Sequence, residues 1–385
     1  MIPYGKQDIN QEDIDSVIDV LKSDFLTQGP LVPKFENKIS NKVGSKYAIA
    51  VNSATSALHI ACLALGLKKD DILWTTSISF VASSNCGLYC GASIDFVDID
   101  RDSFNISYVS LKSKLEIAKK NSKLPKILVV THLCGQSSNM YEISKLSKEY
   151  KFKIIEDASH AIGGKYKDEY IGNCRYSDIT VFSFHPVKII TTAEGGMALT
   201  NDINLASKME LLRSHGITRN PNLMDSNPDG PWYYEQIDLG FNYRITEIQA
   251  ALGLSQLERL DEYVKIRNEL AIRYNKLLSD LPISTPQIIP EAYSAFHLYV
   301  IRLKLNEIHL SKKEVYERLV DAGVGVNLHY IPIHLHPYYK KMGFKPGSYP
   351  EAEHYYNEAI SIPLYPNLTK DMQDTVISEI KKALS

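Results

Sequence analysis

Ile179-Thr-Val-Phe-Ser-Phe-His-Pro-Val-Lys-Ile-Ile-Thr-Thr-Ala-Glu-Gly-Gly-Met-Ala-Leu-Thr200 is the stretch around which the chain is organised. It begins with an apolar, β-branched and aromatic run, 179–184, which predicts a buried strand, and ends with 197–200, which predicts a second one. Between these strands, Lys188 lies in a short apolar segment without an acidic neighbour. A lysine usually lies on a solvated face, but one held among apolar groups loses ammonium stability and has an amine free for Schiff-base chemistry. Lys188 is therefore a candidate catalytic amine.

The composition is that of an ordinary globular chain. The 385 residues are 44% apolar and 23% charged, with a formal net charge of −2, which is typical of a soluble protein with about two to three domains. This balance gives no reason to expect a nucleic-acid or anionic-membrane partner. No apolar run approaches the ~18–20 residues of a membrane span, and the N-terminus lacks the apolar core of a signal peptide.

The five cysteines are odd in number and scattered, and none forms a C-x-x-C pair. They are Cys62, Cys86, Cys90, Cys134 and Cys174. We therefore expect neither a disulfide framework nor a metal site. Free or buried thiols fit a reducing compartment, so we expect a cytoplasmic protein.

Strand-like and helix-like segments alternate through the first 200 residues. Asn10 can cap a first helix, and a second helix follows with Leu31, Phe35 and Ile39 on one face. Further strands are predicted at 47–51, 72–75, 94–99, 127–131 and 153–155, separated by helices at 56–65, 110–119 and 141–150. This alternation predicts an α/β fold with a mostly parallel sheet.

After Leu199 the pattern changes. A helix at 205–212 precedes a polar loop rich in Pro, Asn and Gly, 217–230, and loops of this length are usually functional or disordered. The remainder predicts helices at 246–257, 260–278, 311–322 and 370–384, and strands at 297–303 and 324–329. We predict a large α/β domain, 1–256, and a smaller α+β domain, 257–385.

Polar side chains follow several strands at the sheet edge where ligands bind in open parallel sheets. Asn52-Ser-Ala-Thr55 offers amides and hydroxyls to a phosphate, although alone an ordinary N-cap is the simpler interpretation. Asp157 ends a strand, where aspartates often act only as caps, and Phe80 follows another strand, where a lone aromatic is more often core. Ser183 adds a hydroxyl five residues before Lys188. An amine, a carboxylate, a flat ring and a phosphate cradle are the parts of a pyridoxal phosphate site.

These segments resemble the DegT/DnrJ/StrS family of sugar aminotransferases. The resemblance runs from Pro3 to the end of the chain. Its motifs are Asn52-Ser-Ala-Thr-Ser-Ala57, Ile78-Ser-Phe-Val-Ala82, Glu156-Asp-Ala-Ser-His-Ala161, Ser183-Phe-His-Pro-Val-Lys188, Thr192-Ala-Glu-Gly-Gly196, Arg213-Ser-His-Gly216 and Gly240-Phe-Asn-Tyr-Arg244. The resemblance implies the aspartate-aminotransferase architecture (fold type I), pyridoxal 5′-phosphate (PLP) as cofactor, and a homodimer with shared active sites.

The resemblance also implies a role for individual residues. Lys188 matches the lysine that holds the cofactor covalently, and Asp157 matches the partner of its ring nitrogen. The other matched cofactor positions are Ala54 and Thr55 with Ser183 at the phosphate, Phe80 on the ring, and His160 near the 3-hydroxyl, where many relatives have Gln. Asn242 matches a residue that reaches the phosphate from the neighbouring subunit.

The substrates follow from the same resemblance. Several motifs are most similar to the family branch that serves pseudaminic acid biosynthesis, which implies L-glutamate as amino donor and the C4 ketone of a UDP-linked 4-keto-6-deoxy-N-acetylhexosamine as acceptor. The positions near the sugar-nucleotide pocket are Tyr4, Arg213, His329 and Tyr330, each of which also has a structural interpretation. The loop 217–234 is a candidate lid, and His185 has no assigned role.

Three alternatives stay open at this point. The acceptor could be another nucleotide 4-keto sugar, of the bacillosamine or legionaminic type. Sugar dehydratases of the family use the same cofactor but have histidine in place of the lysine, so Lys188 argues against that branch. A non-catalytic regulator is disfavoured because the full set of cofactor residues is present and no DNA-binding segment is added.

Overall fold

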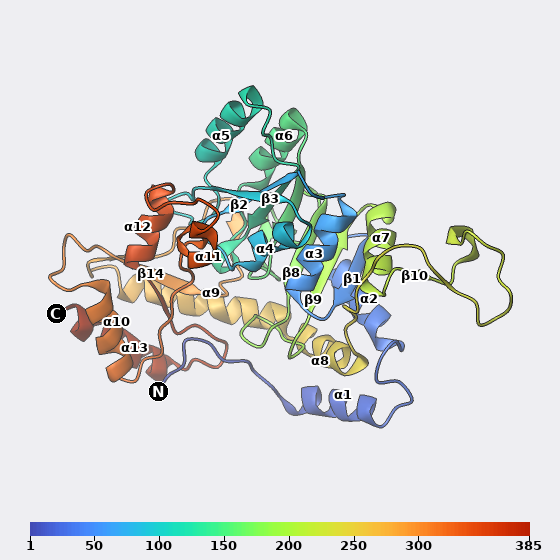
Figure 1. Ribbon diagram of the computed structural model, residues 1–385. Coiled ribbons are helices and arrows are strands. Elements are labelled where there is room, and N and C mark those ends of the chain that lie inside the picture. Colours follow the sequence, from blue (N-terminus) through green and yellow to red (C-terminus); the bar gives the residue numbers. More distant parts are fainter.

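The computed structural model describes residues 1–385 and is built on a seven-stranded sheet (Figure 1). The strand order is β1-β9-β8-β5-β4-β2-β3, and only β9 runs opposite to the others. The strands are β1 (Tyr47–Val51), β2 (Ile72–Thr76), β3 (Ser93–Val97), β4 (Ile127–Thr131), β5 (Lys153–Asp157), β8 (Ile179–Ser183) and β9 (Gly196–Thr200). The expected α/β fold with a mostly parallel sheet is confirmed.

Helices cover both faces of this sheet because its buried strands alternate their side chains between two apolar layers. Ile127 and Val129 of β4 join the layer under α3 (Ala54–Ala64), α4 (Ala82–Tyr89) and α7 (Ile203–Arg213). Leu128 and Val130 face the opposite layer, which α5 (Tyr108–Lys120) and α6 (Met140–Tyr150) cover. At the β1–β9–β8 end, α2 (Leu31–Val43) and α8 (Glu247–Leu257) close that second face.

Side-chain caps fix where several helices begin. Asn10 forms a capping box with Asp13 at the start of α1 (Gln11–Leu21), as predicted. Ser53 caps α3 by accepting the backbone N–H of Ser56, and Thr246 forms a second capping box at α8. The N-cap interpretation of the 52–55 segment is therefore confirmed, and it leaves the first turn of α3 free for a second role.

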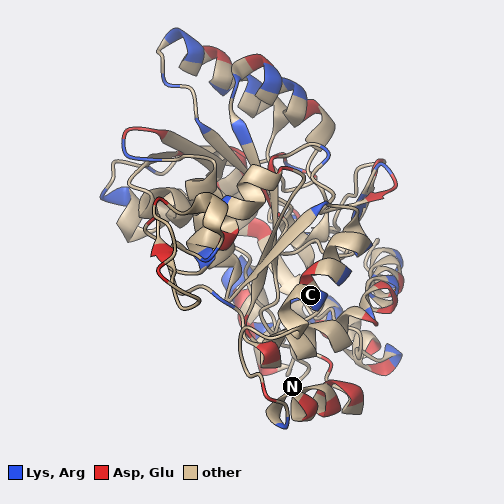
Figure 2. Ribbon diagram, turned by 90° about the vertical axis from the view of Figure 1, so that its right-hand side faces the viewer, with Lys and Arg blue, Asp and Glu red and all other residues tan.

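The C-terminal part forms its own apolar core around α9 (Leu260–Leu277), α10 (Lys312–Asp321) and α13 (Lys370–Leu384). Its sheet has the order β12 (Ile283–Ser284), β14 (Tyr299–Leu303), β15 (Ala359–Ile362). The chain begins and ends in this part of the molecule (Figures 1 and 2). The domain boundary after residue 256 stays a prediction.

One strand prediction is wrong in this part. The segment 324–329 makes only isolated bridges, Val324 with Ile2 and Asn327 with Ser361, because β15 already occupies the place beside β14. The four residues of β15 directly follow α12 (Pro350–Glu358) and are too short for a sequence pattern to separate them from that helix.

The remaining elements are short strands, helices and turns that lie between or beside these layers. They are β6 (Lys165–Tyr166), β7 (Glu169–Tyr170) and β13 (Ala292–Tyr293), which form a small sheet, α11 (Pro337–Lys340), and the short 3-10 turns Leu133–Gly135, Pro221–Leu223 and Ile333–Leu335. No helix combines the length and apolar character needed to cross a lipid bilayer. Lys and Arg alternate with Asp and Glu along the outer helices (Figure 2).

The predicted loop after α7 is an arm that projects from the body of the molecule (Figure 1). Two short strands, β10 (Ile217–Thr218) and β11 (Glu235–Gln236), pair at its base. Trp232 and Tyr234, which directly precede β11, are exposed. In a single copy of the chain this arm extends away from the sheet, so its role as a lid stays a prediction.

Candidate active site

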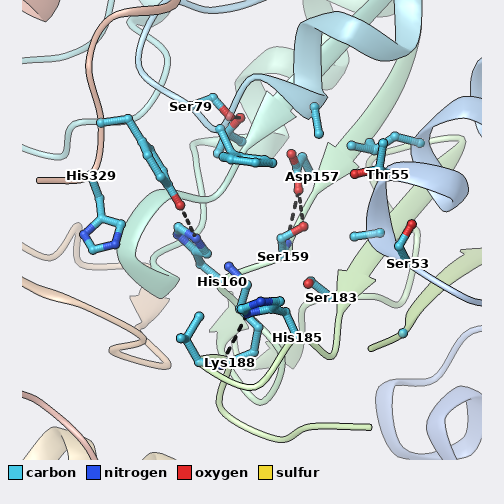
Figure 3. A pocket seen from close by; sticks show the side chains of 18 of the residues that line it. Ser53, Thr55, Ser79, Asp157, Ser159, His160, Ser183, His185, Lys188 and His329 are labelled. Atoms are coloured by element: carbon cyan, nitrogen blue, oxygen red, sulfur yellow. Dashed lines mark hydrogen bonds between the residues drawn. The ribbon is translucent and has the colours of Figure 1, made fainter. Parts of the chain in front are cut away.

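A cavity of about 400 Å³ lies at the carboxyl ends of β4, β5 and β8 (Figure 3). Nine of the twelve residues that the sequence singled out line it: Ala54, Thr55, Phe80, Asp157, His160, Ser183, Lys188, His329 and Tyr330. They come from segments up to 276 positions apart, from Ala54 to Tyr330. The fold therefore brings together most of the predicted set, and the role of each residue stays a prediction.

Lys188 follows β8 in a tight turn, in which its backbone N–H donates to the carbonyl of His185 at 2.9 Å. The side chain is partly exposed because it faces the cavity. Burial lowers the pKa of Lys188 to about 8, although the charge of Asp157 acts in the opposite direction. Just above neutral pH, Lys188 is therefore a neutral amine in a substantial fraction of the molecules.

The same shift predicts that Lys188 destabilises the cofactor-free protein. At pH 7 the ammonium group is charged, and its partial removal from water lowers the free energy of unfolding, because the unfolded chain leaves the same charge fully solvated. This cost disappears as the pH rises through the unfolded value near 10.5. Lys188→Met should raise the free energy of unfolding at pH 7 by about 1–3 kcal/mol, after allowance for the partial exposure. Urea unfolding of both proteins at pH 7 and pH 10 measures this, and a gain that does not shrink at pH 10 would contradict the cause.

Asp157 is a buried carboxylate at the end of β5, held by hydroxyl donors on both oxygens. Ser83 donates to Oδ2 at 2.5 Å, and Ser159 donates to Oδ1 through its hydroxyl at 2.6 Å (Figure 3) and its backbone N–H at 3.3 Å. The cavity therefore contains a fixed negative charge opposite the Lys188 amine.

The N-terminus of α3 forms another wall of the cavity. Its first turn contains no acidic residue, and the N–H groups of Ala54 and Thr55 have no acceptor within the helix, whereas that of Ser56 is bound by the capping Ser53. The hydroxyls of Thr55 and Ser183 line the same cavity. Such a helix end with hydroxyl groups beside it suits a phosphate or another anion.

Gly196 lets α3 approach the sheet this closely. A Cβ at this position would lie 2.4 Å from the backbone N of Ala54. Neither Gly195 nor Gly196 has a positive φ, and the left-handed residue of this segment is Ala193, at 66°. The glycines are needed for space, since a Cβ at Gly195 would meet Thr192 Oγ1 at 2.1 Å.

His160 lies on the side of the cavity away from α3 (Figure 3) and forms a hydrogen bond with Tyr330, which also lines the cavity. Burial and the charge of Lys188 hold the pKa of His160 well below its usual range, so the ring is neutral. Its Nδ1 accepts the backbone N–H of Cys134 at 3.3 Å, which leaves the proton on Nε2, 3.1 Å from the Tyr330 hydroxyl. Burial raises the pKa of Tyr330, so the phenol keeps its own proton. That proton is available to an acceptor in the cavity.

Three predicted residues lie outside the cavity. Tyr4 packs against the ring of His329 with centroids 5.5 Å apart. Arg213 donates to Glu36 at 2.5 Å and to the carbonyl of Ala50 at 2.8 Å, which is the structural interpretation of this residue. Asn242 is exposed beside α7. The ligand contacts proposed for these three stay predictions.

Sequence reasoning missed several polar residues of the site. Ser79, Thr131 and Ser159 line the cavity, as does His185, to which no role had been assigned, and Ser83 lies directly behind it. Ser79 and Ser159 are inside motifs that had been identified, and Thr131 ends a predicted strand, so strand-end position was a usable signal. Ser83 had none, because a buried serine in a helix resembles any other. No group of His, Cys, Asp and Glu in the chain is arranged to hold a metal ion.

Known proteins resemble the chain over its whole length. The DegT/DnrJ/EryC1/StrS aminotransferase family model matches residues 7–381. A UDP-4-amino-4,6-dideoxy-N-acetyl-beta-L-altrosamine transaminase from Campylobacter jejuni (serotype O:23/36, strain 81-176) is 39% identical over 387 residues, covering 99% of this chain and 98% of the relative. The structure of Helicobacter pylori PseC, an aminotransferase involved in the biosynthesis of pseudoaminic acid, has a TM-score of 0.90 at 32% identity, covering 100% and 99%.

A sugar aminotransferase described as putative, Spr1654 from Streptococcus pneumoniae, has structures in PMP and PLP forms. The PMP form superimposes with a TM-score of 0.89 at 26% identity, covering 100% of this chain and 99% of that one, and the PLP form with 0.88 at 26%, covering 100% of both. The expected fold type I architecture, aminotransferase activity and PLP dependence are thereby confirmed at the level of the family. The chain belongs to the DegT/DnrJ/EryC1/StrS aminotransferase family.

Proposed function

We propose that this chain moves an amino group from L-glutamate to the C4 ketone of a UDP-linked 4-keto-6-deoxy-N-acetylhexosamine, with PLP as cofactor. The observation that supports it most is the single cavity that holds the Lys188 amine, the Asp157 carboxylate and the N-terminus of α3. The Campylobacter relative, a UDP-4-amino-4,6-dideoxy-N-acetyl-beta-L-altrosamine transaminase at 39% identity, supports the choice of sugar.

The residues around the cavity fit PLP. The first turn of α3, with Thr55 and Ser183, would hold the phosphate. Phe80 lines the cavity with 57% of its surface exposed, which leaves its ring free to stack on a flat partner. When bound, PLP supplies an electron sink for the substrate carbon that loses its proton.

The chain's own groups would then hold and move protons. Lys188, with a pKa near 8, can take a proton from a carbon acid and return it at the same pH. Asp157 would keep the ring nitrogen of the cofactor protonated. The family resemblance assigns His160 the position near the 3-hydroxyl; because its Nε2–H donates to Tyr330, the phenolic proton of Tyr330 would be the one available there.

A substrate panel tests this proposal directly. The purified protein is loaded with PLP and incubated with L-glutamate and a set of UDP- and dTDP-linked 4-keto sugars, and the products are identified by mass spectrometry and NMR. We expect amination at C4 of the UDP-linked 4-keto-6-deoxy-N-acetylhexosamine, with formation of 2-oxoglutarate. Preferential amination of another 4-keto sugar would contradict the sugar assignment, and no amination at all would contradict the activity.

We further propose that the enzyme is a homodimer whose active sites are shared. Asn242 supports this, because it is exposed and lies outside the cavity of its own chain, although it matches a phosphate-contacting position. The arm from Ile217 to Gln236 also extends beyond the body of one copy, with Trp232 exposed. A closed two-fold pair would bring such groups to the partner's cavity.

Subunit complementation tests the shared site. Lys188→Ala should be inactive, and Asn242→Ala should lose about 10–100-fold through one charge-assisted hydrogen bond. In a co-expressed mixture, half of the dimers pair the two variants, and each such dimer has one complete site. We therefore expect about a quarter of the wild-type rate. A mixture no more active than the mean of its parents would place Asn242 within its own site or outside any.

A further inference from the structure

Three buried hydroxyl groups form a hydrogen-bonded chain that ends on Asp157. Thr131 Oγ1 lies 3.1 Å from Ser79 Oγ, which lies 2.7 Å from Ser83 Oγ, and Ser83 Oγ lies 2.5 Å from Asp157 Oδ2. The three residues come from the end of β4, the loop after β2, and α4. They are 6%, 2% and 0% exposed, so these hydroxyl groups have little contact with water.

The Asp157 carboxylate, at the end of this series of hydroxyl groups, determines which oxygen donates in each hydrogen bond. An ionised carboxylate can only accept, so the single hydroxyl proton of Ser83 goes to Asp157. Ser79 must therefore donate to Ser83, and Thr131 to Ser79. Three O–H dipoles in series thus point at the carboxylate, and such bonds strengthen one another in a water-excluded site.

The hydrogen bonds to Asp157 also determine which of its lone pairs is free. Oδ1 accepts two bonds, from the hydroxyl and the backbone N–H of Ser159, whereas Oδ2 accepts only the one from Ser83. A carboxylate oxygen has room for about two donors. The remaining acceptor site is therefore on Oδ2, and the position of Ser83 decides where it points.

We propose that Ser83 is a positioning residue, which orients the free lone pair of Asp157 Oδ2 towards the cavity and is itself held in place by the Thr131–Ser79–Ser83 chain of hydroxyls. The proposal rests on the proposed function, in which Asp157 receives the ring nitrogen of the cofactor. Ser83 itself does not line the cavity.

The next residue in α4 is a matched control. Ser84 is also 0% exposed, on the same helix, but its hydroxyl bonds to Val81 O at 3.0 Å and to Tyr339 Oη at 2.7 Å. Ser83→Ala and Ser84→Ala thus remove the same group from equally buried sites, and only the first removes a bond to Asp157. Ser83→Cys is a second probe, because the thiol fills nearly the same volume but is a weak donor.

The experiment uses PLP-loaded protein and follows three quantities: the pH titration of the visible absorbance of bound PLP, kcat, and KM for L-glutamate. For Ser83→Ala and Ser83→Cys we expect kcat to fall about 10–100-fold with KM within about threefold, the loss typical of a bond to a charged group. We expect the midpoint of the visible titration to move by about one pH unit. Ser84→Ala should keep kcat within about twofold and leave the midpoint unchanged.

Equal kcat values and equal visible titrations for the Ser83 and Ser84 variants would overturn the positioning role. Asp157→Ala separates this result from failure of the proposed function. If Asp157→Ala loses activity while the Ser83 variants do not, only the positioning role of Ser83 is wrong. If Asp157→Ala is as active as the wild type, the proposed function fails as well.

Discussion

Replacing Lys188 by alanine is expected to lower glutamate-dependent amination by at least about 10⁴-fold and to abolish the visible absorbance of bound PLP. The variant removes both the amine that would hold the cofactor and the base that would move the proton. No other lysine lines the cavity, so no neighbouring amine can substitute. Steady-state rates and absorbance spectra of the PLP-loaded variant measure both effects.

Lys188→Arg is the matched control because it keeps the positive charge near Asp157. A guanidinium stays protonated at all accessible pH values, so it can neither attack the cofactor aldehyde nor accept a proton. We expect the arginine variant to be as inactive as the alanine variant. If it recovered a substantial part of the rate, charge rather than a free amine would be the function of this position.

The second large effect is expected at Asp157, the one buried carboxylate that lines the cavity. Asp157→Asn keeps the shape of the side chain but removes its charge, and with it the stabilisation of a protonated ring nitrogen. We expect kcat to fall by about 10²–10³-fold, the scale on which single preorganised electrostatic groups contribute to catalysis. Initial rates at saturating glutamate measure the loss.

Glu156 provides the control for Asp157. It is the preceding residue of β5, equally buried, but it accepts bonds from His132 at 2.6 Å and Ser177 at 2.5 Å on the other side of the strand. Burial alone would raise the pKa of Glu156, but these bonds, from His132 above all, outweigh it and the pKa is lowered.

Glu156→Gln should therefore cost about 1–3 kcal/mol of stability and little activity. A lowered folded-state pKa gives stability that is present above the unfolded value near 4.5 and lost as the pH falls, so the deficit should shrink in acid. Urea unfolding at pH 7 and pH 4 measures this. A variant at position 156 that lost activity as severely as one at position 157 would mean that local damage, not the charge of Asp157, causes the loss.

Much of the fold could be predicted from sequence because its strands are buried on both faces. Runs such as Ile127–Thr131 and Ile179–Ser183 are continuous and apolar, and caps such as Asn10 mark where helices begin. The four-residue strand Ala359–Ile362 was missed because its partner, Tyr299–Leu303, is sixty positions away and only tertiary pairing defines it. Short strands have no periodicity of their own.

The site was predictable where it follows strand ends. Lys188, Asp157 and Thr55 each lie within a few residues of a predicted strand, so their meeting at one sheet edge followed from topology. The hydrogen-bond partners of the site residues could not be predicted in the same way. That Ser83 reaches Asp157, or that Arg213 pairs with Glu36 177 positions away, depends on helix rotations that a single sequence does not specify.

The antiparallel strand β9 lies between β1 and β8 and keeps the ends of these two strands apart. Gly196 pairs on one side with Val51, which leads into α3, and on the other with Ser183, which leads into the Lys188 turn. Two strand separations of about 4.8 Å therefore set the gap between the anion-binding helix end and the segment that bears the amine. The width of the catalytic centre is in this way a property of backbone pairing, not of side chains. Variation among loops can change which sugar is accepted without altering that width.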